Sequence, residues 1–176
     1  MKFSELVRGA SLRGSPAVFT AATALRLGRA VGTLLRRRSD APGRAPVVVG
    51  RAGEGPELIV RDGLCQGLVL SGFDVVDLGV CESDLFTFAL RTRGEGGAAS
   101  DGAATGGALV GTTGDSLGVM LFAGARPLVG EGLVELARIA DKGAFCVGAG
   151  TLGSRDLRTA FLKNAGQSER DTEADA

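Results

Sequence analysis

Short apolar runs alternate along the chain with longer segments in which apolar residues recur at helical spacing. The apolar runs lie at residues 47–49, 75–80, 108–110 and 119–123, and their length is typical of strands buried inside a domain. The segments with helical spacing are residues 20–35, 57–71, 83–90, 131–140 and 156–164. Strands that alternate with helices predict a sheet covered by helices on both faces.

These elements predict a three-layer α/β/α domain with a mixed, mostly parallel sheet of about four strands. The runs at 108–110 and 119–123 are close enough for an antiparallel pair. Thr20 is a candidate N-cap of the first helix, and Ser83 or Asp84 of the third. Gly72 should end the second helix in a left-handed conformation.

The length of 176 residues is enough for one well-buried core and too short for two ordinary domains. Residues 92–107 are rich in Gly, Ala and Ser and predict a flexible surface loop. The last residues are polar. We therefore expect one domain over residues 1–165 and a disordered tail over 166–176.

The charge balance excludes one class of partner. The chain has 20 basic and 20 acidic residues, so it lacks the net positive field that favours nucleic acid. A basic cluster at residues 36–38 suits the end of the first helix, with a polyanion site as the alternative. No apolar run is long enough for a membrane span or a signal peptide, so we expect a cytoplasmic protein with no membrane partner.

The absence of histidine restricts the possible chemistry. With no histidine and three separated cysteines, the sequence excludes the usual His/Cys zinc sites as well as Ser-His-Asp and Cys-His catalysis. The cysteines lie in apolar segments and predict buried small residues. We expect no metal site, and any catalysis would depend on carboxylates, hydroxyls, arginines or a cofactor.

Three glycine-rich stretches could form ligand-binding turns. Residues 148–153 fit the pattern G-x-G-x-x-G but lack the βαβ unit that a dinucleotide site requires. Residues 49–55 lack the lysine and hydroxyl of a P-loop and predict a strand-to-helix turn. Residues 111–117 offer three hydroxyls and a carboxylate between two apolar runs, so they are the best candidate site, with a plain hairpin loop as the alternative.

Several short segments, in order from about residue 3 to about 165, resemble the first domain of the α-D-phosphohexomutases, the phosphoglucomutase and phosphomannomutase family. The matching segments are residues 6–9 (family G-I-R-G), 19–32 (L-T-x-E … L-G-R-A-x-G), 47–51 (V-V-V-G-R-D), 67–80 (G-L … G-x-D-V-V-D-L-G), 106–110 (G-G-x-M-I) and 126–133, at the entry to the following helix.

The resemblance implies a site at residues 111–116, where the family's reactive loop reads T-A-S-H-N-P. Thr113 stands at the position of the phosphoserine and is the candidate catalytic residue. Gly114 replaces the histidine, and Met120 replaces a lysine. The candidate phosphate-binding residues are Arg8, Arg51, Thr112, Gly114, Asp115 and Ser116.

The resemblance also implies what is missing. The family's magnesium motif, D-x-D-x-D, belongs to its second domain and does not occur here, and sugar recognition comes from its third and fourth domains. We therefore expect a phosphate- or phosphosugar-binding or protein-interaction module of carbohydrate metabolism that is inactive by itself. No cofactor is expected, and Mg²⁺ would act only if a partner supplied the missing domain.

Two alternatives remain. The chain could be one component of a split phosphohexomutase that supplies Thr113 in trans. It could also be a homo-oligomeric structural module that associates through the surface normally covered by the second domain, because such a surface should be apolar in an isolated domain.

Overall fold

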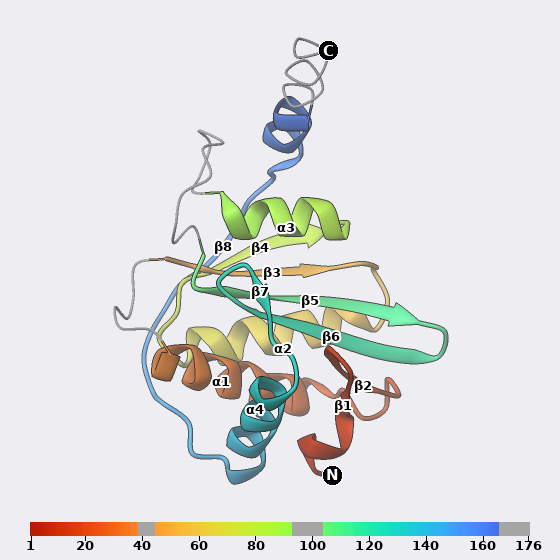
Figure 1. Cartoon of the computed structure of the whole chain (residues 1–176), viewed down its shortest axis with the longest axis vertical. Helices are drawn as coiled ribbons and strands as arrows, with labels where there is room; N and C mark the ends of the chain where they lie inside the picture. The colour runs from red at the N-terminus through yellow and green to blue at the C-terminus, as the bar shows by residue number, and fades with distance from the viewer. Residues whose placement is uncertain (39–44, 93–103, 166–176) are drawn as a thin grey trace.

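A computed structural model describes residues 1–38, 45–92 and 104–165. Its centre is one mixed sheet with the strand order β1-β2-β6-β5-β3-β4-β8, in which β7 pairs with β6 (Figure 1). The strands are β1 (Val7–Arg8), β2 (Ser11–Gly14), β3 (Val47–Arg51), β4 (Val75–Val80), β5 (Gly106–Thr113), β6 (Ser116–Ala123), β7 (Arg126–Pro127) and β8 (Leu152–Ser154).

The sheet is mixed as predicted, but it contains eight described strands rather than about four. Strands β5, β3, β4 and β8 run parallel to one another, whereas the pairings β1–β2, β2–β6, β5–β6 and β6–β7 are antiparallel. The predicted antiparallel pair is confirmed, and antiparallel pairings outnumber the parallel ones among the described strands. The strands that the sequence pattern did not reveal have only two to four residues and carry no apolar run of their own.

The helices form two layers. Helices α1 (Ala21–Arg38), α2 (Glu57–Val69) and α4 (Glu131–Lys142) cover one face of the sheet, and α3 (Ser83–Arg91) covers part of the other (Figure 1). A short 3-10 helix, η1 (Phe3–Leu6), precedes β1, and a further helix spans residues 158–165 beside α3. The predicted α/β class, with helices on both faces of the sheet, is confirmed.

The ends of the helices test the local predictions. The backbone N–H of Thr23 donates to Thr20 Oγ1 at 3.2 Å, which confirms the N-cap of α1, and Gly72 has a φ of +86° just beyond α2. The cap predicted for α3 is wrong, because Ser83 is already helical and Glu82 occupies the N-cap position without a side-chain hydrogen bond. The N–H of Cys81 still donates to Arg51 O, so the chain leaves the sheet only at Glu82 and enters the helix at once.

Each face of the sheet has its own core. The larger core lies under α1, α2 and α4 and includes Val49 and Val110, whereas the smaller core lies under α3 and includes Val48 and Leu109. Adjacent residues of β3 and β5 therefore enter opposite layers, as the two-residue period of a strand requires. Because α3 has only nine residues, its core does not reach the hairpin end of β5 and β6.

The remaining predictions meet the structure only in part. The basic residues Arg36, Arg37 and Arg38 form the last turn of α1, as the helix-end interpretation requires, and Arg38 forms an ion pair with Glu135 at 2.9 Å. Gly106 and Gly107 belong to β5 rather than to a loop, while residues 93–103 and the tail, 166–176, lie outside the described residues.

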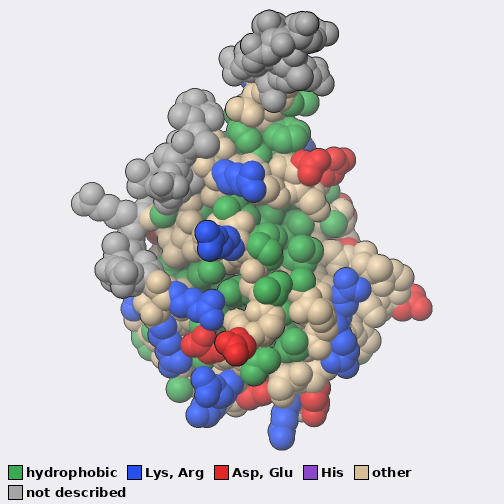
Figure 2. Space-filling view, in the orientation of Figure 1, with side chains coloured by type: hydrophobic (Ala, Val, Ile, Leu, Met, Phe, Trp, Pro, Cys, Tyr) green, Lys and Arg blue, Asp and Glu red, His purple; other side chains and the backbone are tan. Residues whose placement is uncertain are grey.

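No helix in the described ranges has the length and hydropathy of a membrane span. Hydrophobic side chains gather in the middle of the face seen in Figure 2, with Lys and Arg side chains around them.

Candidate functional site

The segment predicted as a loop at residues 111–116 is the end of a regular hairpin. Strand β5 continues to Thr113 and β6 begins at Ser116, directly opposite it, so only Gly114 and Asp115 form the turn. Gly114 has a φ of +58°, and two-residue hairpin turns favour glycine at this position. The Gly-Asp dipeptide between two apolar runs was the available sequence signal. Residues 111–113 belong to β5, so this segment is the plain hairpin that the sequence left open as the alternative rather than an irregular glycine-rich loop.

Thr113 and Ser116 share the face of the sheet that α3 only partly covers. They are cross-strand partners, and the partners Gly111 and Gly118 continue the same face toward the core. The two glycines leave the backbone open beside the hydroxyls. Thr113 is exposed at this end of the sheet.

Arg13 is the charged residue that sequence reasoning missed. It lies on β2 opposite Gly118, and its Nε donates to Ser11 Oγ at 2.9 Å. The Arg13 and Ser11 side chains line a cavity of about 170 Å³ together with Thr113, Ser116 and Ser83 at the start of α3. The alternation of polar Ser11 and Arg13 with buried Leu12 could have revealed that Arg13 faces away from the main core.

Thr112 and Arg51 lie on the opposite face of the sheet from Thr113. The Thr112 hydroxyl donates to Glu57 Oε1 at the start of α2. Arg51, only 7% exposed, donates to Gly53 O at 2.6 Å and pairs with Glu54 at 2.8 Å. The side chains of Thr112 and Arg51 therefore project from the face of the sheet opposite to that of Thr113, although Thr112 is also among the residues that line the cavity beside Thr113.

Arg8, Gly114 and Asp115 are exposed and peripheral. Arg8 lies on the short strand β1, and its Nη1 donates to Val7 O at 2.8 Å. It does not line the cavity beside Thr113, whereas Gly114 and Asp115 occupy the tip of the hairpin turn. Of the candidate site residues, Thr113 and Ser116 are thus the pair whose side chains share the open face.

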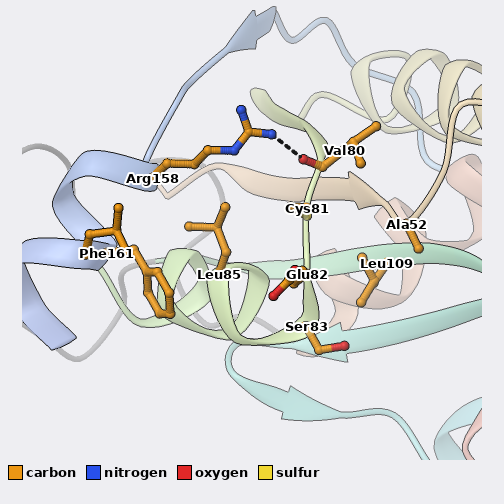
Figure 3. A pocket seen from close by; sticks show the side chains of 10 residues that line it. Ala52, Val80, Cys81, Glu82, Ser83, Leu85, Leu109, Arg158 and Phe161 are labelled. Carbon is orange, nitrogen blue, oxygen red and sulfur yellow. Dashed lines mark hydrogen bonds between the residues drawn. The ribbon is translucent and has the colours of Figure 1, made fainter.

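A second and larger cavity of about 630 Å³ lies between α3 and the helix over residues 158–165 (Figure 3). Its walls share Ala52, Ser83 and Leu109 with the cavity beside Thr113, so the two cavities adjoin. Its apolar side chains are Ala52, Val80, Leu85, Leu109, Phe161 and Leu162.

The polar groups of the larger cavity are few. Arg158 Nη2 donates to Val80 O at 2.9 Å (Figure 3), and Glu82 and Ser83 come from the start of α3. Burial raises the pKa of the Cys81 thiol above its ordinary value, so this wall group is uncharged near neutral pH. The second cavity is therefore mostly apolar, in contrast to the hydroxyl-lined cavity beside it.

The described residues do not form a metal centre. No group of three or more His, Cys, Asp or Glu side chains within the described ranges is arranged to hold an ion.

The chain was compared with models of protein families and with curated proteins. Residues 4–107 match the family model of phosphoglucomutase/phosphomannomutase, alpha/beta/alpha domain I. A sequence search of curated proteins gave no significant match.

Two solved structures are similar to the chain. One is a phosphoglucomutase/phosphomannomutase family protein from Burkholderia thailandensis, with a TM-score of 0.80 and 22% identity. The other is a candidate phosphomannomutase from Thermus thermophilus, with a TM-score of 0.68 and 26% identity. Each match covers 93% of this chain but only 35% and 36% of those proteins, so the chain spans about a third of their length. Because the family model covers residues 4–107 of 176, the chain belongs to the phosphoglucomutase/phosphomannomutase family and carries its domain I.

Proposed function

We propose that this chain is a binding module for phosphate or a phosphosugar and that it does not catalyse phosphoryl transfer by itself. The observation that carries the proposal is the 170 Å³ cavity in which the hydroxyls of Thr113 and Ser116 lie on the same face as the Arg13 guanidinium. Hydroxyl donors and a guanidinium are suitable partners for phosphate oxygens.

The charges around the cavity set the expected strength of binding. Arg13 supplies a cation, but the exposed Asp115 carboxylate at the hairpin tip opposes an anion. The lysine that the family has at position 120 is replaced by Met120, which lines the cavity without a charge. We expect dissociation constants on the order of millimolar, equal to roughly 4 kcal/mol of binding free energy.

The replacements at positions 114 and 120 also remove groups that would support catalysis. Thr113 has a hydroxyl that could accept a phosphoryl group, but Gly114 stands in place of the family's histidine and the chain contains no histidine. Phosphoryl transfer depends on positioning and on electrostatic stabilisation by metal ions and cations. We expect no mutase activity of the isolated chain on glucose or mannose phosphates with Mg²⁺ present. Turnover that copurifies with the chain and disappears in Thr113→Ala would contradict this.

Affinity measurements on matched arginine variants test the binding site. Inorganic phosphate is titrated into the wild type, Arg13→Gln, Arg8→Gln and Arg126→Gln, with Arg126 as an exposed control on β7. We expect Arg13→Gln to weaken binding about tenfold, the order of one charge-assisted hydrogen bond, and the other two variants to change little. A loss in Arg8→Gln with none in Arg13→Gln would place the anion at β1 and contradict the site.

A second candidate function is supported by the exposure of Thr113. Its position at the open end of the hairpin leaves the hydroxyl accessible to another protein, as a split phosphohexomutase would require. A partner that supplies the remaining domains and Mg²⁺ would then produce activity that depends on Thr113. Co-purification followed by a mutase assay with Thr113→Ala and Ser116→Ala tests this, because only the first variant should abolish the activity.

A further inference from the structure

The cavity beside Thr113 adjoins an apolar chamber, and this neighbour bears on the class of ligand. The two cavities share Ala52, Ser83 and Leu109 in their walls, so they meet at these residues. The larger cavity, about 630 Å³, is within the usual size range of small-molecule sites. We call the combined lining of these two cavities the groove, with a polar end beside Thr113 and an apolar end beside Phe161.

The ends of the groove differ in chemistry. At the polar end lie the Thr113 and Ser116 hydroxyls and the guanidinium of Arg13, which is the cation that lines this end. At the apolar end, Leu85 and Phe161 form walls, and Leu162 is 67% exposed at the rim. A ligand complementary to both ends carries an anionic group on an apolar body.

The apolar end offers a sugar few hydrogen-bonding groups. Arg158 Nη2 is already bonded to Val80 O and the Cys81 thiol is a weak hydrogen-bonding group, so Glu82 and Ser83 at the start of α3 are the main polar groups left for a sugar. A hexose that enters this chamber would exchange hydrogen bonds with water for contacts with leucine and phenylalanine, which is unfavourable for each hydroxyl left without a partner. An aromatic or alkyl group would instead gain from burial against the same walls.

We propose that the groove binds phosphate monoesters of an aryl or alkyl group more tightly than inorganic phosphate or hexose phosphates. The phosphate lies beside Arg13, Thr113 and Ser116, and the apolar body lies against Leu109, Leu85 and Phe161. This inference rests on the proposed function, because it uses the same phosphate site, and it narrows the class of ligand.

The test compares three probes on the full chain: inorganic phosphate, glucose 6-phosphate and phenyl phosphate. We expect phenyl phosphate to bind about tenfold tighter than inorganic phosphate, and glucose 6-phosphate to bind no tighter than inorganic phosphate. Arg13→Gln should weaken phosphate and phenyl phosphate by the same factor, since both place a phosphate at that residue.

Two exposed leucines provide a matched pair of variants that should fold normally. Leu162→Asn makes the rim of the apolar chamber polar, whereas Leu152→Asn, on β8, changes an exposed leucine that does not line it. We expect Leu162→Asn to weaken phenyl phosphate binding about threefold while inorganic phosphate is unaffected, and Leu152→Asn to change neither.

The outcomes separate this inference from the proposed function. Equal affinity for inorganic and phenyl phosphate would overturn the apolar chamber as a ligand site while the phosphate site stands. Tighter binding of glucose 6-phosphate than of phenyl phosphate would also overturn it. Failure of every probe to bind would overturn the proposed function and this inference with it.

Discussion

At the scale of single residues, the G-x-G-x-x-G stretch at 148–153 serves close packing in this structure. Gly148 N and Gly150 N donate to the carbonyls of Leu70 and Val69 at the end of α2, both at 3.0 Å. A Cβ atom on Gly150 would overlap the backbone carbonyl of Phe73. The glycines thus let this segment cross directly over the turn after α2, and they need no nucleotide to explain them.

Gly150→Ala and Gly153→Ala form a matched test of this packing. We expect Gly150→Ala to lower the free energy of unfolding by roughly 2 kcal/mol or more, because the backbone of residue 73 must shift. Gly153 has nothing within 4 Å of its Cβ position, so Gly153→Ala should change stability by less than about 1 kcal/mol. Chemical denaturation measures both variants, and equal effects would show that the close approach is not what requires glycine.

Cys65 gives a prediction about alkaline pH. Burial, and to a lesser degree the Asp77 carboxylate, raises the pKa of its thiol to about 12 from an ordinary value of 9.0. A raised pKa favours the protonated folded state, so the contribution to stability is full below pH 9 and is lost as the pH rises toward 12. The chain has no Tyr or His. Burial also raises the pKa of the Cys81 thiol, so Cys81 adds a loss of stability of the same sign in this range.

We expect the free energy of unfolding to fall by about 2 kcal/mol between pH 8 and pH 10.5, and Cys65→Ala to show a smaller fall. The two proteins are compared by the slope of the free energy of unfolding against pH, because Cys65→Ala also changes the packing and hence the absolute stability. A variant with the wild-type slope would show that Cys65 is not the group responsible. Urea denaturation at several pH values provides the measurement.

At the scale of elements, two glycines allow α1 and α2 to pack closely against each other. A Cβ atom on Gly28 would overlap the carbonyl of Leu64, and one on Gly67 would overlap the carbonyl of Leu25. The two helices therefore approach backbone to backbone, and larger residues would force them apart. Both glycines belong to segments by which the sequence resembles its family.

Gly67→Ala should lower the free energy of unfolding by roughly 2 kcal/mol or more, because the helix backbones cannot separate without loss of core contacts. Gln66→Ala changes the exposed neighbouring residue of the same helix and should have an effect below about 0.5 kcal/mol. Thermal or chemical denaturation distinguishes the two. Similar small effects would mean that α1 and α2 can separate easily.

The sequence predicted the elements that have a clear hydrophobic period. Strand β4 has its predicted bounds, and α1, α2 and α4 each lie within about three residues of theirs. Strands β1, β2, β7 and β8 were missed because two to four residues cannot establish a period, and their pairing depends on the rest of the fold. For the same reason the sequence did not reveal Arg13 as a site residue, because its position beside Gly118 depends on the pairing of β2 with β6.

At the scale of the whole molecule, the sheet divides the candidate site residues between two environments. Thr113 and Ser116 lie with Arg13 on the face that leads to α3, and Thr112 and Arg51 lie with Glu57 on the face that leads to α2. The resemblance to the family predicted one site for all of them. The buried Arg51 is already bonded to Gly53 O and Glu54, so an anion there would have to displace existing contacts.

The most direct test of this account is the position of bound phosphate, followed by backbone amide NMR shifts during a phosphate titration. We predict shifts that saturate together at Arg13, Thr113 and Ser116, with little change at Gly53 and Glu57. The measurement uses the full chain at constant pH and ionic strength, because general charge screening would otherwise shift amides over the whole surface. Shifts confined to Gly53 and Glu57, or none at tens of millimolar phosphate, would contradict a phosphate site on the α3 face.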